Sequence, residues 1–127
     1  MTTEQSAVRK LVSQLHRAPR HRFPQLGRAL ACPPRHGVYL IFSPGGRVAH
    51  VGRTTRARAG LVDRLRAYLS GRSSFVALHL KHRRELLRRG YSYAWIEVSN
   101  PRRRALVEAL ATGVICPQHI GTGDRKS

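Results

Sequence analysis

Acidic side chains are scarce in this sequence. Its 127 residues include 6 Asp and Glu against 24 Lys and Arg, which gives a formal net charge of +18 at pH 7. Self-repulsion of this size destabilises a compact domain unless a polyanion neutralises it. Nucleic acid is therefore the leading partner class, with DNA expected before RNA. Histones and ribosomal proteins are also this basic, so the charge argues for binding and does not by itself argue for chemistry.

Cysteines and long apolar runs are also few. The two cysteines, Cys32 and Cys116, are far apart in the sequence, which does not match the ligand spacing of a zinc site. We expect two free thiols in a reducing cytosol rather than a disulfide. No stretch approaches twenty apolar residues and residues 1–5 are polar, so neither a transmembrane span nor a signal peptide is expected. A membrane-surface role is disfavoured because no segment pairs a long apolar face with a basic one. The expectation is one cytoplasmic domain.

Strand-like runs occupy the centre of the sequence. Residues 36–42 and 47–51 are rich in β-branched, aromatic and aliphatic side chains. The turn Ser43-Pro44-Gly45-Gly46 between them predicts a hairpin, because Pro presets one dihedral angle and Gly supplies positive φ. A third run at 91–98 alternates, which predicts a strand with one face formed by Ala94, Ile96 and Val98 and the other by Tyr91, Tyr93 and Trp95.

Helical signals flank these runs. Residues 2–16 carry apolar side chains at helical spacing, and Thr2 with Gln5 predicts a capping box. Further helices are predicted over 57–69, 75–89 and 101–113. The second of these is expected to bury Phe75, Leu78, Leu86 and Leu87. The third begins with Asn100 as N-cap and Pro101 in the first turn.

These elements predict a small α/β (α+β) domain. Its three-stranded antiparallel sheet is formed by strands near 37–42, 47–51 and 91–98, and helices pack around it. The predicted division of the chain is an N-terminal helix with a basic connector over 1–33, the main domain over 34–120, and a disordered tail over 121–127. The N-terminal helix is expected to pack on the domain, with a contact to DNA or a partner chain as the alternative.

The order of short motifs resembles that of the GIY-YIG nuclease superfamily. Gly37-Val38-Tyr39 matches the first triplet and His50-Val51-Gly52 the second, followed by Arg53 and by Arg64-Leu65-Arg66-Ala67-Tyr68 in a predicted helix. Ala105-Leu106-Val107-Glu108 with a later Pro117 is similar to the family's carboxylate helix and its tail. The likeness is strongest to the nuclease module that begins the bacterial excision-repair incision subunit, and it covers roughly residues 34–119.

This resemblance implies metal-dependent endonucleolytic cleavage of DNA. Tyr39 would be the general base, Arg64 the clamp on the scissile phosphate, and Glu108 the ligand of Mg²⁺, with Mn²⁺ as the alternative ion. The six acids are scattered, which disfavours a two-metal carboxylate cage and fits one metal with one carboxylate and help from arginine. The residues expected to contact nucleic acid are Arg53, Arg56, Arg58, Tyr68, Arg102 and Arg103.

Each of these residues also has a structural interpretation. Tyr39 could be a core residue of its strand, and Arg64 one of many solvated arginines. Glu108 lies in an apolar run where an unpaired carboxylate is costly, so it could instead pair with an arginine. Arg102 and Arg103 are at the positive end of a helix dipole, which costs stability. A bound phosphate would offset that cost, and plain solvation is the alternative.

Two positions depart from the family pattern. His50 replaces the second motif's tyrosine, and Ile120 occupies a place that is often Asn. Histidine still forms hydrogen bonds and titrates near neutrality, so His50 is counted among the catalytic candidates with a changed pH profile. The alternative function is a nucleic-acid-binding protein that keeps the fold and has lost cleavage. A ribosome-type RNA-binding protein is a third possibility that explains the charge but not Glu108.

Overall fold

The computed structural model describes residues 1–56 and 58–121. An antiparallel sheet forms its middle layer, with the strand order β1-β4-β2-β3. The strands are β1 (His21–Arg22), β2 (Gly37–Phe42), β3 (Val48–Arg53) and β4 (Ser92–Glu97). All six residues of β2 are buried because this strand has a neighbour on each side and a layer on each face.

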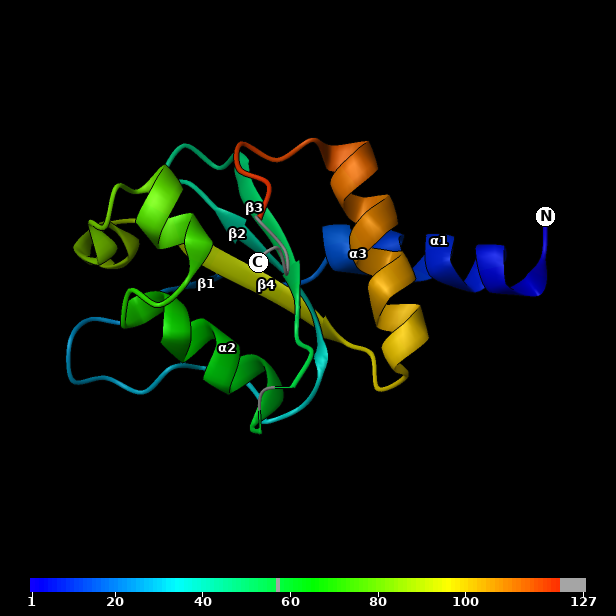
Figure 1. Cartoon of the computed structure of the whole chain (residues 1–127), viewed down its shortest axis with the longest axis horizontal. Coiled ribbons are helices and arrows are strands. Elements are labelled where there is room, and N and C mark those ends of the chain that lie inside the picture. Colours follow the sequence, from blue (N-terminus) through cyan, green and yellow to red (C-terminus); the bar gives the residue numbers. More distant parts are fainter. Residues whose placement is uncertain (57, 122–127) are drawn as a thin grey trace.

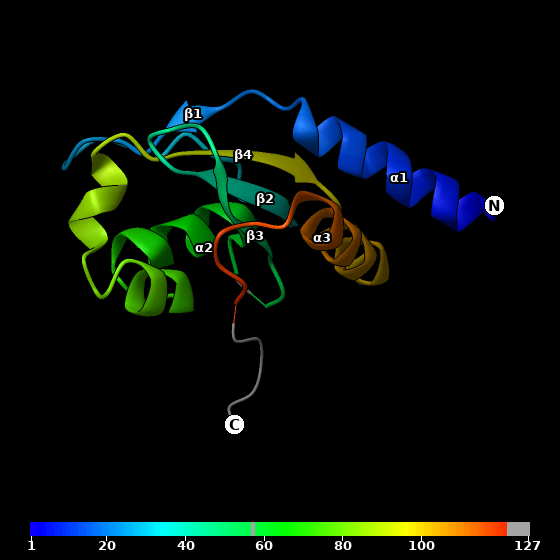
Figure 2. The same ribbon diagram turned by 90° about the horizontal axis from the view of Figure 1, so that it is seen from above.

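Helices cover both faces of the sheet (Figures 1 and 2). The α1 helix (Thr3–His16) and the α3 helix (Pro101–Ile115) pack on one face, against Val38, Leu40 and Phe42. The α2 helix (Gly60–Leu69) and two short helical turns, η1 (Phe75–His79) and η2 (Arg84–Arg88), cover the other face. The predicted alternation along β4 is confirmed, since Ala94 and Tyr93 belong to opposite core layers.

The fold prediction missed one strand. Strand β1 lies in the stretch expected to be a connector, and its residues His21 and Arg22 pair with Tyr93 and Ser92 of β4. The next residue, Phe23, is only 3% exposed and belongs to the α2-side core. Two residues are too few to show the alternation that identifies a strand, so only the pairing with β4 reveals it.

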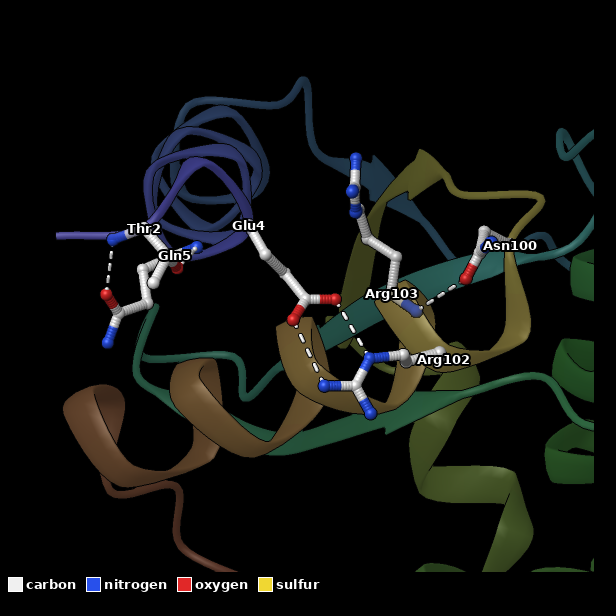
Figure 3. A network of polar contacts seen from close by, with 6 residues as sticks. All are labelled: Thr2, Glu4, Gln5, Asn100, Arg102 and Arg103. Carbon is white, nitrogen blue, oxygen red and sulfur yellow. Dashed lines mark hydrogen bonds and ion pairs between the residues drawn. The ribbon is translucent and has the colours of Figure 1, made fainter.

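The predicted N-terminal helix is confirmed and packs on the domain. Gln5 N–H donates to Thr2 Oγ1 at 3.0 Å and Thr2 N–H donates to Gln5 Oε1 at 2.7 Å, which is the predicted capping box (Figure 3). Val8, Val12 and Leu15 bury their side chains in the core layer shared with α3. Segment 1–16 thus contributes directly to the core.

The single helix predicted over 75–89 was wrong. The chain forms the π-helical turn η1, then Lys81 and His82 with φ of 52° and 66°, and then the 3₁₀ turn η2. Two consecutive left-handed residues interrupt any continuous helix. Leu78, expected inside, is 58% exposed, because the wider η1 turn does not follow the 3.6-residue period.

The other helices begin and end close to their predicted positions. Helix α2 is described from Gly60, and residue 57 of its predicted start lies outside the described residues. Asn100 caps α3 as predicted, with its Oδ1 accepting from Arg103 N–H at 2.9 Å. That helix runs two residues beyond Gly113, to Ile115, and Cys116 with a φ of 54° is its C-cap. Within residues 1–56 and 58–121, no helix has the length and apolar character needed to cross a membrane.

Candidate active site

A cleft of about 870 Å³ lies at β3, one of the two edge strands of the sheet, beside α2, α3 and the segment after α3. The predicted site residues that line it are Tyr39, His50, Arg53, Arg56, Arg64 and Glu108. These side chains come from two strands, two helices and the loop after β3. The cleft therefore brings together at least one residue from each of the four motifs that carry the family resemblance.

Tyr39 reaches this cleft by lying across a glycine. Tyr39 on β2 is the cross-strand partner of Gly52 on β3. A Cβ atom built on Gly52 would collide with the Tyr39 ring and its hydroxyl oxygen. The missing side chain thus provides the space through which a phenol from the central strand extends to the sheet edge. This explains in physical terms why a glycine follows Val51 here.

Two tyrosines and one arginine form a hydrogen-bonded cluster at the cleft wall. The Tyr39 and Tyr68 hydroxyl oxygens are 2.8 Å apart, and Arg64 Nε donates to Tyr39 Oη at 3.2 Å. The Arg64 guanidinium carbon lies 4.9 Å from the centre of the Tyr68 ring. Arg64 and Tyr68 are one turn apart on α2, so one helix face supplies both groups. Tyr68 is fully buried behind Tyr39, where it can orient the phenol.

Burial governs the acidity of this cluster. Loss of solvation raises the pKa of Tyr39, and the Arg64 charge and the hydrogen bonds from Tyr68 and Arg64 only partly oppose this rise. The pKa of Tyr68 lies well above its ordinary value, first because of burial and second because of the neighbouring Tyr39. Both phenols are therefore protonated at neutral pH. When ionised, Tyr39 would accept hydrogen bonds from both neighbours.

Glu108 projects from α3 into the same cleft and pairs with Arg53. The Arg53 Nη1 group donates to Glu108 Oε1, and the two side chains are 34% and 24% exposed. The ion pair that the sequence left open as an alternative for Glu108 is thus present. Glu108 also lies close enough to Tyr39 for its negative charge to raise the pKa of that phenol.

The chemistry of the donor set bears on whether a metal ion fits here. Among residues 1–56 and 58–121, no group of three or more His, Cys, Asp and Glu side chains is arranged to hold a metal. The other carboxylate of the cleft, Asp63, accepts a hydrogen bond from Ala59 N–H at 2.8 Å in the first turn of α2. Among the described residues of the cleft, Glu108 is then the one carboxylate positioned to take a cation, in competition with Arg53, and this fits Mg²⁺, which commonly binds one or two carboxylates together with water and substrate phosphate.

His50 is almost fully buried beside a second histidine that the sequence did not indicate. His50 Nδ1 lies 3.2 Å from the His119 carbonyl oxygen and 3.2 Å from His119 Nδ1. Because a carbonyl only accepts, His50 carries its proton on Nδ1. Burial lowers the pKa of His50 to about 4, so this imidazole is neutral at pH 7.

The segment after α3 explains how His119 comes to the site. His119 N–H donates to Ala49 O at 2.9 Å and Gln118 N–H donates to Val48 O at 3.2 Å, so this segment runs along the outer edge of β3. Such pairing leaves no signal in the sequence.

Ile120 lines the cleft but is 69% exposed, and nothing in the structure assigns it a role. Further cleft residues absent from the predicted set include Asp63, Arg66, Arg72, Thr112 and His119.

The remaining predicted nucleic-acid contacts lie outside the cleft lining. Arg102 pairs with Glu4 of α1 through two hydrogen bonds of 2.9 and 3.0 Å (Figure 3). Arg103, Arg58 and Tyr68 are likewise absent from the residues that line the cleft, and Tyr68 is fully buried, so it has no surface to offer to nucleic acid in this structure. The dipole cost of Arg102 is therefore offset by Glu4, within the protein. Arg104, which the sequence did not single out, is 4% exposed and donates to the carbonyls of Thr54, Val98 and Ser99.

Solved structures similar to this chain identify its fold. No protein-family profile matches the sequence, and no curated protein is detectably similar to it. Among solved structures, the GIY-YIG N-terminal endonuclease domain of UvrC from Thermotoga maritima, bound to its catalytic divalent cation magnesium, has a TM-score of 0.52 and 19% identity. The match covers 93% of this chain and 97% of that domain. A point mutant of the same domain, also bound to its catalytic divalent cation, gives the same TM-score and identity, with 96% of that chain covered. The chain therefore has the GIY-YIG endonuclease fold.

Proposed function

We propose that this protein is a metal-dependent nuclease that hydrolyses phosphodiester bonds in nucleic acid, with DNA as the first substrate to test. The observation that carries the proposal is the meeting of Tyr39, Arg64 and Glu108 in one cleft. They come from β2, α2 and α3, far apart in the sequence. A nuclease would require these three side chains in one cleft. The net charge of +18 also suits a polyanionic substrate.

Arg64 suits the task of holding the scissile phosphate. Its Nε–H is used by Tyr39, which leaves the four N–H groups of its outer nitrogens for phosphate oxygens. The contact with Tyr39 fixes the guanidinium at the wall of the cleft. A phosphate held by Arg64 would thus be next to the Tyr39 hydroxyl.

Tyr39 would act as the base for the attacking water. The phenolate oxygen takes one proton from water while the water oxygen bonds to phosphorus, and the bond from phosphorus to the leaving sugar oxygen breaks. Arg64 and Tyr68 would stabilise the phenolate by donating to it. Because burial raises the pKa of Tyr39, only a small fraction is ionised at neutral pH, and catalysis should speed up in alkaline solution.

Glu108 would hold the metal ion, with Mg²⁺ the best match for a single carboxylate and Mn²⁺ the alternative. A bound divalent cation neutralises negative charge that develops on the phosphoryl and leaving oxygens. The Arg53 guanidinium pairs with Glu108 in this structure. With a metal ion bound to Glu108, Arg53 would be free to contact a substrate phosphate.

A nucleic-acid-binding protein without cleavage is the second candidate. Three observations favour it: the neutral buried His50 in place of tyrosine, the raised pKa of Tyr39, and the carboxylate of Glu108 already satisfied by Arg53. The convergence of Tyr39, Arg64 and Glu108 argues for the nuclease, since binding alone requires no carboxylate in a basic cleft.

Cleavage assays separate the two functions. Supercoiled plasmid and labelled single strands are incubated with Mg²⁺, Mn²⁺ or EDTA, using wild type, Glu108→Gln and the control Glu97→Gln, which removes an exposed acid outside the cleft lining. The nuclease hypothesis expects metal-dependent cutting that is lost in Glu108→Gln and kept in Glu97→Gln. Salt-sensitive binding with no cutting under any condition would instead establish the binding protein.

A further inference from the structure

A second hollow of about 630 Å³ lies between the loop after β1, the C-terminal end of α2, and η2. We call it the arginine groove, because its walls carry four arginines and one glutamate: Arg28, Arg66, Arg84, Arg88 and Glu85. The glutamate is paired with Arg83, at 3.2 Å between Oε2 and Nε, and Arg83 is not part of the lining. The groove therefore presents positive charge that its own acid does not neutralise.

Two of these arginines are fixed in place by the backbone. Arg84 Nη1 donates to Ser70 O at 3.1 Å, and Arg88 Nη1 donates to Pro24 O at 2.6 Å. Each bond uses one of the five N–H groups of a guanidinium. The orientation of both side chains is thus set, and most of their donors stay available to an anion.

Arg66 connects the groove to the cleft. It is exposed on α2 and lines both hollows, so positive charge continues from Arg64 in the cleft, over Arg66, to the groove. Among residues 1–56 and 58–121, Arg66 and Arg28 have no ion-pair partner. The loop after β1 and the C-terminal end of α2 lie at the same end of the molecule (Figure 1).

The size and lining of the groove indicate its ligand. Its volume falls in the range of small-molecule pockets, roughly 300–1,000 Å³, which admits a few nucleotides of one strand but not a duplex. Leu26 on the rim is 84% exposed and offers an apolar surface to sugars or bases. Several guanidinium groups in one hollow that shares Arg66 with the cleft suit the repeated negative charges of a phosphodiester backbone.

We propose that the arginine groove binds a single strand of nucleic acid that continues from the cleft across Arg66, so that the preferred substrate carries an unpaired segment next to the scissile phosphate. This proposal rests on the nuclease function above, because it takes the cleft to hold the phosphate that is cut. It goes beyond that function in two respects. It assigns a binding site outside the cleft, and it specifies the preferred substrate as a duplex with a single-stranded tail.

Binding without metal tests this site independently of cleavage. Fluorescence anisotropy in EDTA compares a blunt duplex with the same duplex carrying a 3′ or a 5′ tail. The test variant is Arg28→Gln/Arg84→Gln, which removes two positive charges from the groove and keeps a polar side chain at both positions. The matched control is Arg9→Gln/Lys10→Gln, which removes the same charge from exposed positions of α1, on the opposite side of the sheet.

Wild type and control should bind one tailed duplex at least tenfold more tightly than the blunt duplex. The Arg28→Gln/Arg84→Gln protein should lose this advantage, and the slope of log Kd against log salt for the tailed duplex should fall by about 1.4, at roughly 0.7 per single-strand phosphate contact. Equal binding of tailed and blunt duplexes by wild type would overturn the proposal. So would an equal loss on both substrates in the test variant.

Cleavage of the same duplexes in Mg²⁺ distinguishes a failure of the arginine-groove proposal from a failure of the nuclease proposal. Cutting without any tail preference in binding would support the nuclease function and refute the arginine groove as a binding site for a single strand. A tail preference that depends on Arg28 and Arg84, without cutting, would support the groove as a single-strand site and count against the nuclease.

Discussion

The phenol of Tyr39 lies directly over the backbone of Gly52 on the neighbouring strand. This contact joins two sequence motifs that each look weak alone, since Gly37-Val38-Tyr39 supplies the phenol and His50-Val51-Gly52 supplies the space beneath it. The same contact directs the Tyr39 hydroxyl to Arg64 and the cleft. It also identifies the position in the sheet where the smallest substitution should have the largest effect on the site.

Gly52→Ala should displace Tyr39 and remove activity. The added methyl group would collide with the phenol, and overpacking a buried contact of this kind costs typically 1–3 kcal/mol, so we expect a loss of about 2 kcal/mol in the free energy of unfolding. Denaturant unfolding measures this loss, and the plasmid assay measures the rate. Gly45→Ala is the control, because no atom lies within 4 Å of its added carbon. Full activity of Gly52→Ala would mean that the position of Tyr39 does not matter.

The rate of cleavage should rise with pH through the neutral and alkaline range. The base is active as the phenolate, and burial raises the pKa of Tyr39 above its ordinary value of 10.0. Below that pKa the ionised fraction grows tenfold for each pH unit, so log(kcat/KM) should rise with a slope of about 1. Single-turnover cleavage between pH 6 and 9 measures the slope. Tyr39→Phe should abolish cleavage at every pH, and a flat profile would exclude Tyr39 as the base.

Local sequence signals predicted the parts of the fold that are locally encoded. The hairpin around Ser43-Pro44-Gly45-Gly46, the Thr2–Gln5 capping box and the Asn100 cap all depend on residues within a few positions of one another, and all are observed. The break at Lys81 and His82 could not be seen, because residues 75–89 contain no Gly, Pro or Asn that would indicate the end of a helix.

For the candidate site too, the sequence indicated the residues that lie in recognisable motifs and missed the contacts between distant segments. The motif order placed Tyr39, Arg64 and Glu108, which the structure brings to one cleft. Their chemical roles stay predictions. Three features that the sequence did not indicate depend on contacts between distant segments: the pairing of the His119 segment with β3 at the cleft and, outside the cleft lining, the Arg102–Glu4 pair and the buried Arg104. In an arginine-rich chain, nothing local distinguishes a buried arginine from a solvated one.

Acidification should destabilise the protein through His50. Its pKa in the folded state is about 4 against an ordinary value of 6.5, so between these values the unfolded chain takes up a proton that the folded protein excludes. Stability is therefore complete above pH 6.5 and falls as the pH drops toward 4. The contribution is about 3 kcal/mol between pH 7 and pH 4, at about 1.4 kcal/mol per pKa unit.

Denaturant unfolding at pH 7 and pH 4 of wild type and His50→Gln isolates this contribution. Glutamine does not titrate and keeps a polar amide of similar size at this position. The wild type should lose about 3 kcal/mol more than the variant on acidification, since other groups titrate in both proteins. Equal losses would show that His50 is not kept neutral by its burial.

Removal of Arg53 should strengthen divalent metal binding at Glu108. Arg53 donates to the one carboxylate assigned as metal ligand, so a metal ion must compete with this guanidinium. In Arg53→Gln the carboxylate loses its cationic partner, and we expect the Kd for Mn²⁺ in the absence of nucleic acid to fall severalfold. Both partners are partly exposed, which keeps the effect well below that of a buried ion pair. Arg56→Gln is the matched control, since it removes the same charge from the cleft lining without touching Glu108. Titration followed by electron paramagnetic resonance measures the affinities.

Two outcomes would contradict this prediction. Weaker Mn²⁺ binding in Arg53→Gln than in Arg56→Gln would mean that Arg53 supports the metal site rather than competing for it. If none of the proteins binds Mn²⁺, Glu108 is not a metal ligand.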